Sequence, residues 1–255
     1  MTRRFAFFFC LIALTLPASA SFISLQTELR PIIDKQQLFI TVSAVNKGDE
    51  SAYNVWGELR MPGKRFPLRK QAVVEPLAIY GAKQTIVLPD SFNNDPLLLT
   101  MHYQDANQYP FSALSAIVVG REKRPSPLLG AIRPISFVSA SELSIALKNQ
   151  RGRPLEIGIE LFLPEELTTD FQPTKLKLAP NADRTIKVKL TNFSALPGSS
   201  YQLFAVAQGA GQTIIIPGTI RIEAGNAILG LDRTWLIIIL VGLGAFFLAA
   251  QIYKR

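Results

Sequence analysis

Residues 38–46 read LFITVSAVN, and this stretch decides the fold class. Two sets of side chains alternate along it: Leu38, Ile40, Val42 and Ala44 in one set, and Phe39, Thr41 and Ser43 in the other. A period of two places the two sets on opposite faces of a β-strand. Residues 186–191, IKVKLT, repeat the alternation in the second half of the chain. The pattern therefore predicts strands in both halves.

Short runs of β-branched and aromatic residues, separated by Gly, Pro, Asn and Asp, continue outward from this stretch. The predicted strands are 22–30, 38–46, 52–61, 83–88, 97–103 and 113–119 in the first half, and 133–138, 142–148, 155–163, 184–191, 201–207 and 213–222 in the second. No stretch between them keeps a 3.6-residue apolar period for three turns. Six or seven short strands in about 100 residues are typical of an immunoglobulin-like sandwich. We therefore expect an all-β protein with two tandem immunoglobulin-like β-sandwiches.

The two halves also match each other. Glu58-Leu59 with Pro62 aligns with Glu160-Leu161 and Pro164 at an offset of 102. The strand that begins at Thr85 aligns with the one that begins at Thr185 at an offset of 100. A near-constant offset predicts a duplicated domain. Convergence of ordinary strand patterns is the alternative, and either origin leaves two sandwiches.

The N-terminal 20 residues have the order of a secretory signal peptide. Arg3 and Arg4 precede an apolar run over residues 5–16, and small residues at 18–20 end the segment. We expect cleavage after Ala20. Cleavage removes Cys10, the single cysteine, so the mature chain relies on packed cores and not on disulfides.

A second apolar segment predicts a membrane span. Residues 235–253 contain no charged residue, and as a helix they cover about 28 Å, close to the bilayer's hydrocarbon thickness. Trp235 and Tyr253 stand where interfacial aromatic residues belong, and Lys254-Arg255 form a basic tip that favours the cytoplasmic side. The prediction is one C-terminal transmembrane helix, with the body exported to the periplasm or cell exterior and the C-terminus cytoplasmic.

The predicted division of the chain follows from these segments. It comprises a signal peptide at 1–20, sandwich 1 at 21–120, a Pro-containing linker at 121–131, sandwich 2 at 132–223, a juxtamembrane linker at 224–234, the span at 235–253 and the tip at 254–255. With the span after sandwich 2, we expect sandwich 1 to lie distal to the membrane.

The net charge of the exported body is low. Loss of Arg3 and Arg4 and placement of the tip inside take the net charge from +8 to about +4, which does not favour nucleic acid as a partner.

The turns carry a family resemblance. The first half contains Asn46, Gly48, Ala52, Val55 and Pro62, then Gly81 and Thr85-Ile86-Val87-Leu88; the second contains Asn149, Gly152, Ile157 and Pro164, then Thr185-Ile186-Lys187-Val188. This pattern resembles the envelope modules called CARDB and NEW3, although residues 181–183 replace the glycine that leads the later strand. The resemblance covers both halves and implies structural turns and core positions, with no common chemistry.

Few residues point to catalysis or to a cofactor. His102 is the single histidine, so no His/Cys metal cage can form within one chain. We interpret His102 as a packed or solvated strand-end residue, and the Glu165-Glu166 pair as a solvated turn. Asp90, Asp95 and Asp105 lie in predicted turns and are candidates for calcium, although they lack the dense D-x-D-x-D spacing of a calcium-binding loop. Neither a phosphate-binding glycine loop nor a Gly-x-Ser-x-Gly motif occurs. We expect a protein that is not an enzyme and that needs no cofactor.

Basic residues provide the candidate binding site. Lys64, Arg65, Arg69 and Lys70 cluster in a predicted loop, with further basic residues at 121–124 and at 151 and 153. Such a cluster fits an acidic polysaccharide, lipid head groups or a carboxylate of a partner, and a solvated surface is the alternative. Asn192-Phe193-Ser194 matches the N-glycosylation sequon.

Two functions remain in competition. The first is a single-span, non-catalytic envelope protein whose sandwiches bind or position an envelope protein or polysaccharide. The second is a membrane-tethered, pilus-type (PapD-like) periplasmic chaperone or assembly factor. Its client would pair with the alternating strand 113–119, and Arg30 and Arg121 would grip a client carboxylate. A chaperone that diffuses freely should not carry residues 235–253.

Overall fold

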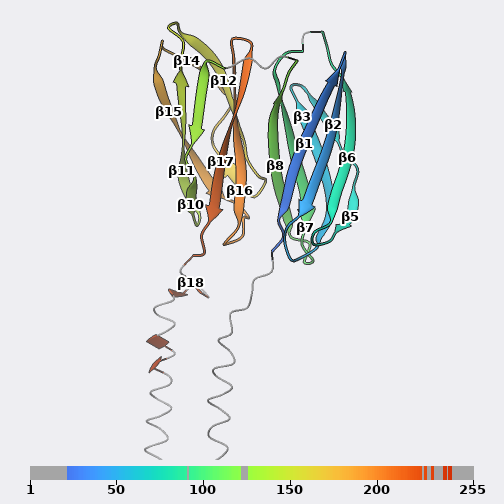
Figure 1. The fold of residues 1–255 in the computed structure, drawn as a ribbon. Helices are drawn as coiled ribbons and strands as arrows, with labels where there is room; N and C mark the ends of the chain where they lie inside the picture. The colour runs from blue at the N-terminus through green and yellow to red at the C-terminus, as the bar shows by residue number, and fades with distance from the viewer. Residues whose placement is uncertain are drawn as a thin grey trace, which may run out of the picture.

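The computed structural model describes residues 22–90, 92–121 and 126–225, with four short pieces at 227–228, 231–232, 238–239 and 241–242. The all-β prediction is confirmed, since strands make up the regular structure of residues 22–225. They form two units, which we call the first unit (residues 22–121) and the second unit (residues 126–225) (Figure 1). Each has its own core of buried apolar side chains.

The first unit contains two antiparallel sheets. One has the order β1-β2-β6; the other has the order β4-β3-β7-β8, with β5 also paired to β3. The strands are β1 (Leu25–Asp34), β2 (Gln37–Asn46), β3 (Ala52–Met61), β4 (Lys64–Pro67), β5 (Gln71–Val74), β6 (Ile79–Val87), β7 (Asp95–Gln104) and β8 (Pro110–Val119). The two sheets face each other, as expected for a β-sandwich.

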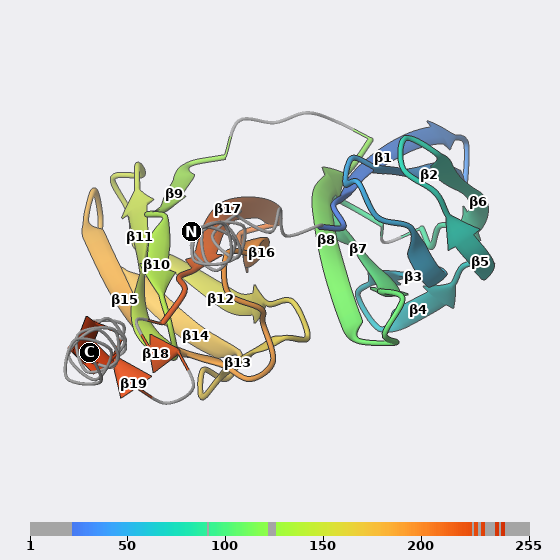
Figure 2. The same ribbon diagram turned by 90° about the horizontal axis from the view of Figure 1, so that it is seen from below.

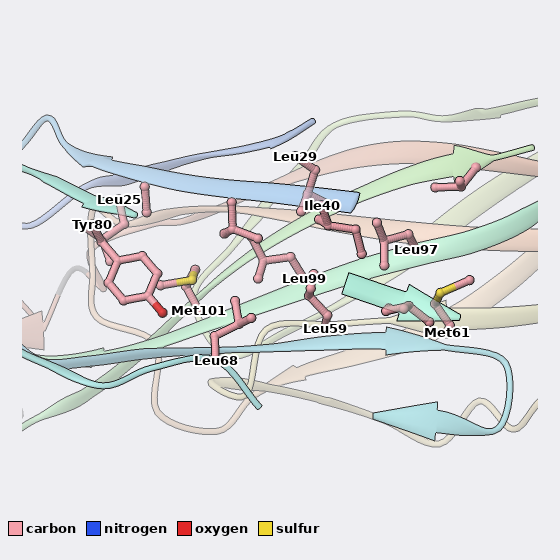
Figure 3. Close-up of a cluster of buried hydrophobic side chains, with 14 of the residues drawn as sticks. Leu25, Leu29, Ile40, Leu59, Met61, Leu68, Tyr80, Leu97, Leu99 and Met101 are labelled. Atoms are coloured by element: carbon pink, nitrogen blue, oxygen red, sulfur yellow. The ribbon is translucent and has the colours of Figure 1, made fainter. Parts of the chain in front are cut away.

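The first core lies between these sheets. The alternating set of β2 is buried as predicted, with Leu38 and Val42 fully inaccessible. Leu59 of β3 and Leu99 of β7 meet this set from the opposite sheet, and Tyr80 closes one end (Figure 3). The Tyr80 hydroxyl donates a hydrogen bond of 2.6 Å to the Arg69 carbonyl, so the ring is buried without leaving its polar atom unpaired.

The second unit repeats this plan with one sheet of order β13-β15-β11-β9 and another of order β10-β17-β16-β12-β14. The strands are β9 (Leu128–Ile132), β10 (Ile135–Phe137), β11 (Ala140–Asn149), β12 (Leu155–Phe162), β13 (Leu167–Thr169), β14 (Thr174–Leu178), β15 (Asp183–Asn192), β16 (Ser200–Gly209) and β17 (Gln212–Ile222). All pairings are antiparallel except that β10 runs parallel to β17. A further short pair, β18 (Ala227–Ile228) and β19 (Leu231–Asp232), follows.

Two buried asparagines occupy equivalent places in the two units. Asn46 ends β2, and its side-chain amide donates to the Glu50 and Val74 carbonyls while its oxygen accepts from the Gly48 amide. Asn149 ends β11 and makes the corresponding bonds to the Arg153 and Ala179 carbonyls and the Arg151 amide. Both side chains are fully buried. The repeated bonds explain why an asparagine stands at each position.

The two units lie side by side (Figures 1 and 2). Equivalent strands of the two units run in opposite directions, as contacts at both ends of the interface show. The β7–β8 hairpin of the first unit lies beside the β15–β16 connection of the second, because the Tyr109 hydroxyl donates to the Ser194 carbonyl. At the other end the β16–β17 hairpin lies beside the β6–β7 connection, because the Thr213 hydroxyl donates to the Asn94 carbonyl. The β7–β8 and β16–β17 hairpins are equivalent in the two units, and so are the two connections that they contact. The same contact therefore occurs at both ends of the interface.

The described body begins and ends at the same end of the molecule. Residues 22–24 lead into β1 there, and β17 finishes at Ile222 there (Figure 1). We call this the terminal end and the opposite one the far end. The first unit lies beside the second and not beyond it along the chain direction (Figures 1 and 2).

Two boundary predictions also need correction. Strand β9, Leu128–Ile132, pairs with β11 inside the predicted linker 121–131, so the ladder of the second unit begins before residue 132. Lys64 and Arg65 belong to strand β4 and not to a loop. Both strands are short, and a five-residue or four-residue run gives little periodicity to detect.

The predicted signal peptide at 1–20 lies outside the described residues, as does nearly all of the predicted span at 235–253. Among the residues that are described, the structure contains no helix that is long and apolar enough to cross a membrane.

Candidate functional site: the interface between the two units

An apolar centre joins the two units. Leu98 of β7 and Leu114 of β8 are buried but belong to neither core, and the same is true of Phe204 and Val206 of β16. Strand β8 packs against β16 and β17, and Leu98, Leu114 and Phe204 line one shared cavity. These side chains are therefore covered by the opposite unit. This explains why β16 is buried on both faces from Leu203 to Ala207.

A buried carboxylate lies next to this centre. Glu166 is only 2% exposed and reaches from the second unit to Ser112 of β8. The Ser112 amide donates to its Oε1 at 2.7 Å, and the Ser112 hydroxyl donates to its Oε2 at 2.6 Å. The same hydroxyl accepts a bond of 2.9 Å from the Glu165 amide. One serine thus connects the edge of the first unit to two consecutive residues of the second.

The environment of Glu166 raises several pKa values. Burial is the main cause for Glu166 itself, whose pKa lies above its ordinary value even though the bonds from Ser112 favour the charged form. Burial, with a smaller effect from the charge of Glu166, raises the pKa of Tyr201 to about 12 and the pKa of Tyr103 still further. All three groups hold their protons more tightly than in water.

Charged and aromatic groups surround a cavity of about 200 Å³ at the interface. Arg60 of β3 donates to Glu160 of β12 at 3.0 Å, and its guanidinium carbon lies 5.0 Å from the centre of the Phe162 ring. On the same side His102 Nδ1 lies 3.2 Å from Glu165 Oε2, and the His102 ring stacks on Trp56 with centroids 4.1 Å apart. One cation of the first unit, Arg60, is therefore matched by a carboxylate of the second, and a histidine ring of the first unit lies beside another.

The four basic residues predicted as a binding site do not converge. Arg65 lines the interface cavity and pairs with Glu58 at 3.5 Å. Arg69 donates from Nε to the Gly81 carbonyl at 2.7 Å, and its guanidinium lies over the Tyr80 ring. Lys64 and Lys70 are exposed, and neither forms an ion pair within the described residues. Two of the four cations thus have structural partners and two face solvent.

Other candidates from the sequence have structural partners. His102 lies on β7 and is packed, as interpreted. The solvated-turn interpretation is wrong for Glu166, which is buried. Asp95 begins β7 and Asp105 follows its end, so at about 3.3 Å per residue the two lie roughly 30 Å apart and cannot share a calcium ion. The described residues contain no group of three potential metal ligands.

Two surface residues are also held by neighbours. The Asn192 amide of the sequon donates to the Val138 and Ala195 carbonyls, which occupies the nitrogen that would carry a glycan. Arg30, the residue assigned to a client carboxylate, is paired with Glu28 at 2.7 Å.

Sequence reasoning missed the interface residues Ser112, Glu166 and Arg60. The available indication was the apolar run at 203–207, LFAVA, because consecutive apolar residues in a strand predict burial on both faces. No pattern within one strand identifies the partner of such a face.

No protein-family model matches the sequence, and no curated protein is significantly similar to it. Among solved structures, a Salmonella alpha-2-macroglobulin reacted with methylamine is 15% identical with a TM-score of 0.34, over 79% of this chain and 16% of that one. The native alpha-2-macroglobulin of E. coli is 15% identical with a TM-score of 0.31, over 78% and 17%. Red sea bream transglutaminase is 12% identical with a TM-score of 0.28, over 80% and 31%. The chain spans less than a third of each, and likeness at this level assigns no activity.

Proposed function

We propose that this protein is a single-span, membrane-anchored and non-catalytic envelope protein whose body binds or positions another envelope component. In this proposal the two units are tandem immunoglobulin-like sandwiches of the CARDB and NEW3 type, and residues 235–253 form the anchor. The body is exported and the C-terminus is cytoplasmic.

The observation that carries the proposal is the fixed interface. Apolar burial at Phe204, the buried Ser112–Glu166 bonds and the Arg60–Glu160 pair hold the two units in one arrangement. A chain that joins two domains only through a linker leaves their relative orientation free. A fixed pair, with both ends of the described body at the terminal end, presents its far end at a constant distance from the point where the chain leaves the body. This is the property that a scaffold needs.

The same contacts favour the scaffold over the chaperone. A strand-donating chaperone needs the open edge of β8 for its client. Here the Ser112 amide on that edge already donates to Glu166, and β8 packs against β16 and β17.

The surface that remains available for a partner includes Lys64, which begins β4 at the far end and pairs with Met61 at the end of β3. Lys70 is also exposed without an ion pair among the described residues. An acidic polysaccharide or an acidic protein surface fits these two cations. Arg69 is excluded from this role because its guanidinium supports Gly81 and Tyr80.

The test is a crosslinking pull-down from intact membranes with the full chain. We compare the wild type with the double variant Lys64→Ala/Lys70→Ala, and use Lys175→Ala/Lys177→Ala as a control that removes two exposed lysines from β14. Recovery of a defined envelope complex with wild type and control, but less with the first variant, supports the proposal. Equal recovery with all three removes the two lysines from it. Absence of the protein from the membrane fraction contradicts the anchor.

A further inference from the structure

Two equivalent turns differ in one residue. Glu75-Pro76-Leu77-Ala78 and Ala179-Pro180-Asn181-Ala182 close with the same bond, from the fourth amide to the first carbonyl, at 3.0 and 3.3 Å. The third residue has a positive φ in both, 65° at Leu77 and 53° at Asn181. Asparagine tolerates this conformation, whereas a bulky leucine is an outlier. Leu77 is nevertheless 75% exposed, so burial does not explain the leucine.

The residues next to this turn also differ between the two units, and again the first unit has the apolar side chain. Ile79, at the start of β6, is 61% exposed, and its equivalent at the start of β15 is Asp183. Val73, exposed at the end of β5, corresponds to Lys177 near the end of β14. The first unit thus exposes apolar side chains where the second exposes polar or charged ones.

Because the two units run in opposite directions, the equivalent turns at Leu77 and Asn181 lie at opposite ends of the molecule and face different surroundings. The turn at Leu77 lies at the terminal end, because the Leu77 amide bonds to the carbonyl of Asn46, whose residue pairs with Leu25 at the start of β1. The turn at Asn181 lies at the far end, beside the Asn149 turn and the start of β9. The apolar version therefore faces the end from which both ends of the described chain leave.

The second unit also exposes apolar side chains at the terminal end. Phe193 is 76% exposed just after β15, and Val138 lies exposed beside it, with the Val138 carbonyl bonded to Asn192. The chain passes the same end at Gly225, and the uncharged segment 235–253 follows within about 35 Å of extended chain. A bilayer that holds this segment lies within reach of the terminal end.

We propose that the terminal end of the body rests on the lipid surface, with Leu77, Ile79 and Phe193 in the interfacial layer. The inference rests on the anchored topology of the proposed function and adds a second attachment, which fixes the tilt of the body. Exposed aliphatic and aromatic side chains gain free energy by leaving water at such a surface. The strained leucine at position 77 then has a reason that the fold alone does not supply.

The experiment places an environment-sensitive fluorophore on single cysteines in the full chain, in a Cys10→Ser background reconstituted into phosphatidylcholine vesicles. Leu77→Cys is matched by Asn181→Cys, which has the same backbone at the far end. Phe193→Cys is matched by Leu129→Cys, an exposed apolar position at the far end of the second unit. Phosphatidylcholine with a nitroxide near the head group is the quencher.

The expected result is a blue shift and a loss of fluorescence at 77 and 193, with neither change at 181 and 129. If the protein floats with the vesicles but all four probes behave alike, the inference is wrong and the anchor stands. A blue shift at 77 without quenching means that protein covers the site, which also overturns lipid contact. If the protein does not float with the vesicles, the anchor and the inference fail together.

Discussion

Ser112 and Glu166 form a two-bond contact that crosses the interface between the units, with the Ser112 amide and hydroxyl donating to the two oxygens of one buried carboxylate. The contact satisfies an edge amide of β8 and fixes Glu166, which would otherwise be a buried charge without a partner. Because each group depends on the other unit, the contact couples the stability of the interface to the charge of Glu166.

The first prediction concerns pH. Since burial raises the pKa of Glu166 in the folded protein, the folded state binds the proton more tightly than the unfolded state does. This group therefore makes the free energy of unfolding rise as the pH falls through the raised folded pKa toward 4.5, and its contribution is least favourable above that folded pKa. Glu166→Gln keeps the shape and should remove this dependence. Urea unfolding between pH 5 and 8 measures it.

The control for this prediction is Glu165→Gln, which changes the exposed neighbour of Glu166. Because the charge of Glu165 is the smallest of the causes that act on the pKa of Glu166, this change should leave most of the pH dependence from Glu166 in place. If Glu166→Gln and the wild type show the same slope of stability against pH, the carboxylate does not act as described.

The sequence predicted those features that one strand or one turn contains. The alternation at 38–46 places Leu38 and Val42 in the core, and the structure buries both. The two asparagines at the ends of β2 and β11 were part of the repeated pattern, and each is the buried centre of its turn.

The interface could not be predicted in this way, because the residues that form it are far apart in the chain. Phe204 is buried by residues about 100 positions earlier, so its own strand shows only that both faces are apolar. Glu166 looked like half of a solvated acidic pair, and its burial depends on Ser112, 54 residues away. The reversal of the second unit is set by these contacts, and no local pattern encodes it.

The second prediction concerns the connection between the units. Limited trypsin digestion should cut first within residues 121–124, as the basic residues there and the prolines at 125 and 127 that follow them predict. The cut halves of the wild type should still elute together in gel filtration, because the interface holds them. In Phe204→Ala the halves should separate, since truncating a buried Phe costs about 3 kcal/mol. Phe39→Ala, on the outer sheet face, is the control, and separation of the wild-type halves would contradict a stable interface.

The third prediction tests the equivalence of Asn46 and Asn149. Asn46→Ala leaves the Gly48 amide and two carbonyls without their partners, and one unsatisfied buried group already costs about 1–3 kcal/mol. We expect Asn149→Ala to cost a similar amount, because it loses the same three bonds. Denaturant unfolding gives both values, with Gln26→Ala as an exposed control. A loss confined to one of the two sites would show that the repeats are not energetically equivalent.

The fourth prediction separates stability from surface contact at the turn of Leu77. A left-handed backbone costs an ordinary residue roughly 1–2 kcal/mol, and asparagine escapes part of this cost. Leu77→Asn should therefore raise the free energy of unfolding in detergent solution by about 1 kcal/mol, and Asn181→Leu should lower it by a similar amount. In vesicles, Leu77→Asn should weaken lipid quenching of a probe at position 79, although the protein is more stable, while Asn181→Leu leaves that quenching unchanged. Denaturant unfolding and quenching of the same variants measure the two effects. If Leu77→Asn were less stable than the wild type, the leucine would stabilise the folded body itself. Contact with a lipid surface would then not be required to explain a leucine at this exposed position.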